Sequence, residues 1–101
     1  MTSRTATHLL TYASLPTVDL HCHLRGAMPP SLARSLATKH NLKLPIPPYA
    51  SEYRFSGFDD FLTLYDQVGH VIRAAEDLRE VALEYLRSVA MGGTRYVEFM
   101  I

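Results

Sequence analysis

A regular alternation of apolar and polar residues opens the interpretable part of the chain. The apolar positions are Val18, Leu20, Cys22 and Leu24, and they alternate with Asp19, His21, His23 and Arg25. This period of two predicts a β-strand over residues 17–23, with Asp19, His21 and His23 together on one face. We expect Gly26 to end the strand.

Three later segments carry apolar residues at intervals of three and four, which predicts helices over residues 31–40, 58–72 and 75–91. The stripe of the second helix comprises Phe58, Phe61, Leu62, Tyr65, Val68 and Ile72. The stripe of the third comprises Leu78, Val81, Ala82, Tyr85, Leu86 and Val89. Both stripes predict packing against a core. Lys39 and His40 are expected to face outward, and Asn41 to end the first helix in a left-handed conformation.

A second strand is predicted over residues 94–101, after a stop at Gly92 and Gly93. Its apolar run favours a strand covered on both faces. Glu98 interrupts this run and needs a partner. It either points toward a metal site or pairs with a basic residue, and the pairing is the favoured interpretation.

The order of these elements predicts an α/β fold, because a helical crossover implies two parallel strands. A complete (β/α)₈ barrel needs about 250 residues, whereas this chain has 101. The family resemblance described below implies that residues 15–101 are the N-terminal portion of a TIM-type barrel. Residues 1–14 are expected to be a flexible lead-in. Residues 49–56 are expected to be a loop that is either a plain surface loop or, as the same resemblance implies, a segment that helps to cover the active site.

Composition narrows the function classes. The formal net charge is zero, so nothing favours binding to nucleic acid or to an anionic membrane. No apolar run approaches the roughly 18 residues that a membrane span requires. A single cysteine rules out an internal disulfide and fits a reducing compartment. The expected location is the cytoplasm.

Two histidines at spacing two on one strand face lie roughly 6–7 Å apart at Cα and can both reach one metal ion. Chance pairing of histidines is the plainer explanation. A metal site is nevertheless favoured here, because an acid precedes His21 and a glycine turn follows His23. Zinc at a strand end on a strand-to-helix loop is typical of barrel enzymes.

Residues 15–28 resemble the opening of the adenosine deaminase family, a branch of the metal-dependent amidohydrolases. Residues 58–65 and 92–99 are similar to later segments of the same family. The resemblance implies a zinc-dependent hydrolase that deaminates adenosine or a related aminopurine and releases ammonia. It implies that His21 and His23 are metal ligands for one zinc ion, and that His23 and Arg25 contact a small purine-like substrate.

The same resemblance assigns a third histidine ligand, an aspartate ligand and a catalytic glutamate to later strands. This chain therefore supplies no catalytic residue, and its zinc site is incomplete. The chain alone is expected to be inactive and to self-associate through unpaired strand edges.

Arg25 stands where many adenosine-specific members of the family carry an acid, which makes plain adenosine an uncertain substrate. A guanidinium favours phosphate, carboxylate or carbonyl groups. One alternative is therefore a dihydroorotase-like cyclic amidohydrolase, in which Arg25 would bind a substrate carboxylate. A different class of alternative is an inactive truncated barrel that acts only as an interaction fragment.

Overall fold

The computed structural model describes residues 15–101, and the predicted lead-in over residues 1–14 lies outside this range. The elements, in chain order, are strand β1 (Thr17–His23), 3₁₀ helix η1 (Leu24–Ala27), helices α2 (Pro30–Lys39), α3 (Phe58–Gly69) and α4 (Ala75–Met91), and strand β2 (Thr94–Met100). The two strands pair in parallel. Each predicted helix and strand is present, although α3 ends before Ile72 and Gly26 lies within η1.

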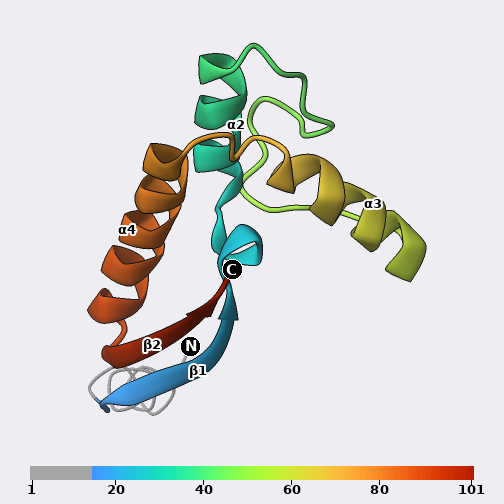
Figure 1. Ribbon diagram of the computed structural model, residues 1–101. Helices are drawn as coiled ribbons and strands as arrows, with labels where there is room; N and C mark the ends of the chain where they lie inside the picture. The colour runs from blue at the N-terminus through green and yellow to red at the C-terminus, as the bar shows by residue number, and fades with distance from the viewer. Residues whose placement is uncertain (1–14) are drawn as a thin grey trace.

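The chain leaves the carboxyl end of β1, passes through η1 and three α-helices and returns to the amino end of β2 (Figure 1). Helix α4 runs back along the sheet and packs on η1 and β2, whereas α3 projects away from the other elements. This arrangement is a parallel strand–helix–strand unit, as in the first part of a barrel. No helix within residues 15–101 has the length and apolar character needed to span a bilayer.

A small core lies where η1, α2 and α4 meet the carboxyl end of α3. Its buried members are Leu24, Met28, Ala33, Leu36, Ala37, Val68, Val71 and Val81. Burying a side chain of this kind contributes about 1.5–3 kcal/mol relative to leaving it in water. The core therefore fixes η1, the segment that directly follows the histidine pair.

Asp77, in the first turn of α4, joins that helix to α2. Its carboxylate is fully buried, accepts hydrogen bonds from the backbone N–H groups of Arg73 and Ala74, and contacts Lys39 Nζ at 2.8 Å and His40 Nε2 at 2.7 Å. Lys39 is exposed as predicted, although its ammonium contacts this acid. The prediction that His40 faces outward is wrong, because its ring is half-buried against the same carboxylate. The Lys39 ammonium is the largest cause of a pKa for Asp77 far below its usual range.

Helices α2 and α4 end at the stop residues that the sequence predicts. Asn41 adopts a φ of 55° just beyond α2, and Gly93 adopts a φ of 96° just beyond α4. Both residue types tolerate this left-handed conformation, which favours a helix stop. The end of α4 thus sets the start of β2.

Three expectations about burial need correction within residues 15–101. On α4, Val81 is fully buried as predicted, but Leu86 is exposed. On α3, Val68 is buried, whereas Phe58 and Leu62 are exposed. On β2, Tyr96 and Met100 are exposed, so the strand is not covered on both faces. Helical or strand period tells which residues share a face, but it does not tell what lies opposite that face.

Candidate metal and substrate site

The imidazoles of His21 and His23 converge at the carboxyl end of β1. Their Nε2 atoms lie 3.1 Å apart, the rings meet edge to face, and both side chains are exposed. Two zinc–nitrogen bonds of about 2.0–2.1 Å at a tetrahedral angle put the nitrogens roughly 3.3 Å apart. The pair therefore fits two ligands of one zinc ion. Without a metal, the same separation fits a hydrogen bond between opposite tautomers.

The pair is not a complete metal site by itself. Among residues 15–101, no group of three or more histidine, cysteine or acidic side chains is close enough to hold an ion. Catalytic zinc generally has three protein ligands and an open position. The described residues therefore bring together two candidate ligands, His21 and His23, at this point.

Asp19 does not share the histidine face, contrary to the prediction from alternation. Across the sheet, Asp19 pairs with Val97 and Cys22 with Phe99, so two residues of β1 oppose one residue of β2. This β-bulge inserts one residue and reverses the phase of the alternation. Asp19 therefore comes to lie with the buried Cys22.

Tyr85 of α4 confirms this placement, since its hydroxyl donates a hydrogen bond to Asp19 Oδ2 and lies within reach of the Cys22 thiol. The hydrogen bond from Tyr85 is the largest cause of a lowered pKa for Asp19. The same bond raises the pKa of Tyr85 above its usual range. The carboxylate and the phenol are therefore locked in their charged and neutral forms at neutral pH.

Arg25 lies in η1, just after β1, and its side chain packs against α3. Its guanidinium stands 5.6 Å from the ring centroid of Tyr65, and its Nη2 lies 3.9 Å from Asp66 Oδ1. A Cβ built on Gly69 would lie 2.1 Å from Arg25 Nη2. The absence of a side chain at Gly69 therefore makes room for Arg25. The side chain is 45% exposed, so its donors also face solvent.

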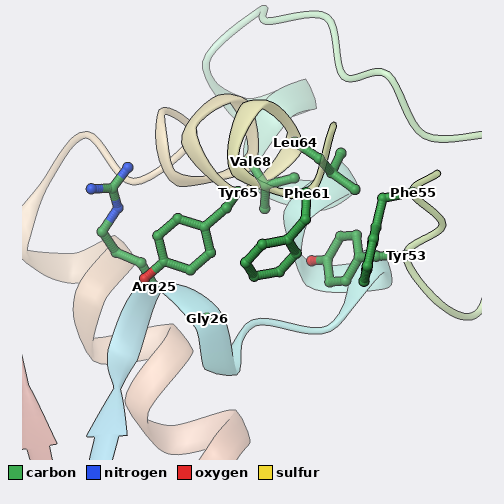
Figure 2. A pocket seen from close by; sticks show the side chains of 8 residues that line it. All are labelled: Arg25, Gly26, Tyr53, Phe55, Phe61, Leu64, Tyr65 and Val68. Atoms are coloured by element: carbon green, nitrogen blue, oxygen red, sulfur yellow. The ribbon is translucent and has the colours of Figure 1, made fainter. Parts of the chain in front are cut away.

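An aromatic pocket with about 440 Å³ of empty space, part of it open to solvent, lies between η1, α3 and the preceding loop (Figure 2). Its lining residues are Arg25, Gly26, Tyr53, Phe55, Phe61, Leu64, Tyr65 and Val68. Figure 2 shows Arg25 on one side of Tyr65 and the other aromatic rings of the pocket on the opposite side. Flat rings and one cation at the rim suit a planar ligand that carries hydrogen-bond acceptors.

Sequence reasoning missed the contribution of Tyr53 and Phe55, which lie in the loop over residues 49–56. Tyr53 is fixed there because its hydroxyl donates a hydrogen bond of 2.6 Å to the Met28 carbonyl. Burial raises the pKa of Tyr53 to about 12. Two aromatic residues at spacing two in a polar loop are the only sequence signal that could have pointed to this wall.

Glu98 was expected to pair with a basic residue, but its partner is different. The Tyr96 hydroxyl donates a hydrogen bond of 2.8 Å to Glu98 Oε1, and both residues are exposed. This contact lies along β2 and involves neither His21 nor His23. Glu98 therefore adds nothing to the histidine pair in the described chain.

Comparisons with known proteins point to one family. The family model for adenosine deaminase matches residues 16–101. An adenine deaminase from Rhizobium rhizogenes is 38% identical over 87 residues, which are 86% of this chain and 27% of that protein. An aminodeoxyfutalosine deaminase from Acidothermus cellulolyticus is 33% identical over 88 residues, which are 84% of this chain and 25% of that protein.

The crystal structure of an adenine deaminase from Arthrobacter aurescens superposes with a TM-score of 0.73 at 31% identity, over 84% of this chain and 27% of that structure. With the parallel strand–helix–strand unit, this match defines the fold as the N-terminal portion of a (β/α)₈ barrel. The chain belongs to the adenosine deaminase family. It spans about a quarter of the length of the curated relatives it matches.

Proposed function

We propose that this chain forms the first part of a zinc-dependent hydrolase that deaminates adenine or a related aminopurine and releases ammonia, a reaction of purine metabolism. Membership in the adenosine deaminase family supports the deaminase reaction over the dihydroorotase-like alternative. The names of the similar proteins, adenine deaminase and aminodeoxyfutalosine deaminase, support an aminopurine-like substrate.

The observation that carries the proposal is the 3.1 Å separation of the two Nε2 atoms at the carboxyl end of β1. In this proposal His21 and His23 hold one zinc ion together with ligands from elsewhere. Zinc, when bound, supplies Lewis-acid activation of a water molecule for attack on the substrate. The burial of Cys22 on the opposite side supports the assignment, because it leaves both imidazoles on the open side of the strand.

The remaining residues of the site bind and orient the substrate. The rings of Phe61 and Tyr65 offer apolar surface for a flat heterocycle. His23 lies at the junction between the metal pair and η1, where it contacts the substrate in this proposal. Arg25 donates from the rim to a carbonyl or an anionic substituent of the substrate, which favours adenine derivatives that carry such a group.

We further propose that the 101 residues alone do not catalyse the reaction at a useful rate. Two histidines are one ligand short of the three that catalytic zinc sites generally use. The exposed apolar residues on the strands, among them Val18, Leu20 and Tyr96, favour self-association of the isolated chain.

The test assays ammonia release by the full-length protein with zinc, using adenine, adenosine and acid-substituted adenines as substrates. We expect turnover of at least one of them, and a loss of about 1,000-fold or more in His21→Ala and His23→Ala. His70→Ala is the matched control, because His70 is also exposed and, within residues 15–101, its ring bonds only Asp66. If His21→Ala and His23→Ala both kept the activity of the wild type, as His70→Ala should, the proposal would be disproved.

A further inference from the structure

The β-bulge in β1 lies at the first histidine of the pair. Leu20 and His21 together oppose a single residue of β2, because the flanking pairs are Asp19 with Val97 and Cys22 with Phe99. A one-residue slip in a strand turns the side chains beyond it to the other face. The bulge is therefore the feature that allows Asp19 and Cys22 to face α4 while the histidines remain exposed.

The Asp19 carboxylate holds this bulge from two sides. Its Oδ1 accepts a hydrogen bond of 3.2 Å from the backbone N–H of His21, the usual way in which an aspartate stabilises backbone two residues ahead. Its Oδ2 accepts a hydrogen bond from the Tyr85 hydroxyl. One carboxylate thus ties the backbone of His21 to helix α4.

Tyr85 is itself fixed by packing. Its ring meets Phe99 of β2 edge to face, with centroids 5.8 Å apart. Phe99 is the residue that pairs with Cys22 at the end of the bulge. The chain of contacts therefore runs from β2 through Tyr85 and Asp19 to the backbone of His21, and it involves no atom of either imidazole.

We propose that Asp19 and Tyr85 are positioning residues for the metal pair: by holding the bulge they set the direction of the His21 imidazole, and with it the separation of the two Nε2 atoms. The inference rests on the proposed metal role of His21 and His23. Ligands supported from outside the metal's own coordination typically lose about 10–100-fold in metal affinity when that support is removed. Here the support acts through the backbone, so we expect the lower end of this range.

The experiment measures zinc affinity of the full-length protein by competition with a chelator, at a temperature where every variant is folded. Tyr85→Phe removes one hydroxyl and keeps the ring on Phe99. The matched control is Tyr96→Phe, which removes a hydroxyl that bonds only Glu98 in the described chain. We expect Kd for zinc to rise about tenfold in Tyr85→Phe and to stay unchanged in Tyr96→Phe.

A second variant tests whether Tyr85 and Asp19 affect zinc affinity through the same chain of contacts or independently. Asp19→Ala removes both hydrogen bonds, so it should weaken zinc binding at least as much as Tyr85→Phe. If the phenol acts through the carboxylate, adding Tyr85→Phe to Asp19→Ala changes Kd no further. The absorption spectrum of the cobalt-substituted protein should shift in the same variants, since it reports ligand geometry.

The outcomes distinguish this inference from the proposed function. If Tyr85→Phe lowers the melting temperature but binds zinc like the wild type, while His21→Ala loses zinc, the positioning role is wrong and the metal site stands. If His21→Ala binds zinc as tightly as the wild type, both the metal site and the positioning role are wrong.

Discussion

Helices α3 and α4 carry apolar stripes of similar length, yet the described chain covers them very differently. On α4, Val81 is 0% exposed and sits in the core beside η1, with Asp77 anchoring the helix to α2. On α3, Val68 is buried in the core and Leu64 packs against it, but Phe58 remains 72% exposed. The stripe of α4 therefore stabilises the unit that carries His21 and His23, whereas the stripe of α3 provides one wall of a pocket.

The largest expected effect is on α4. Val81→Asp buries an unpaired charge and should cost about 4 kcal/mol or more in the free energy of unfolding, enough to unfold a marginal domain. Leu86→Asp on the same helix is the control, because Leu86 is 39% exposed, and it should cost less than about 1 kcal/mol. Urea titration of both variants checks this. Equal losses would mean that α4 does not bury the face described here.

Asp77 should give the next largest effect. Asp77→Asn weakens the link to Lys39 and His40, and breaking a buried ion pair is strongly destabilising. We expect the melting temperature to fall by roughly 10 °C. Glu76→Gln, an exposed neighbour that also contacts Lys39, should change it little. A smaller loss in Asp77→Asn than in Glu76→Gln would contradict the anchoring role.

The same carboxylate predicts a pH dependence. The pKa of Asp77 is lowered in the folded state, so its stabilisation is present above the unfolded carboxyl pKa of about 4 and is lost as the pH falls below that value. The melting temperature should therefore fall more steeply between pH 6 and pH 2 for the wild type than for Asp77→Asn. Parallel curves would show that other carboxyl groups cause the acid sensitivity.

For α3 we expect an effect on substrate binding rather than on the stability of the fold. Phe61→Ala opens the aromatic wall, and loss of one stacking ring should raise KM about tenfold in the full-length protein, with kcat changed less. Phe58→Ala is the control, since Phe58 does not line the pocket described above. Steady-state kinetics on the best aminopurine substrate checks the difference. An unchanged KM in Phe61→Ala would remove the pocket from the proposed site.

The smallest stability change is expected at Gly69. Alanine is the better helix former by about 1 kcal/mol, but its Cβ would displace the Arg25 guanidinium, so the two effects oppose each other. We expect a net change within about 0.5 kcal/mol and a change in preference among substrates that differ in charge. If Gly69→Ala leaves that preference intact while Arg25→Ala alters it, Arg25 does not need its position on α3.

Much of this arrangement could be predicted from local signals. The bounds of β1 follow from its alternation, and those of α4 follow from acids in its first turn and Gly92 and Gly93 at its end. The parallel pairing follows from the helical crossover. Each of these features depends on neighbours in sequence, which is why the residues alone suffice.

The placement of Asp19 and Asp77 could not be predicted in the same way. The bulge leaves the alternation of residue types in β1 unchanged, and only the pairing with β2 reveals the inserted residue. The partners of Asp77 come from α2, far away in sequence. The prediction that Phe58 and Leu62 of α3 are buried failed for a related reason, because a helical stripe does not specify what covers it.

We propose above that His21 and His23 are this chain's two ligands in one metal centre. Crystals of the full-length zinc-loaded protein, measured at the zinc absorption edge, test it directly. We expect one anomalous peak within about 2.0–2.1 Å of the Nε2 atoms of both histidines. A zinc peak bound by only one of them, or by neither, would contradict it.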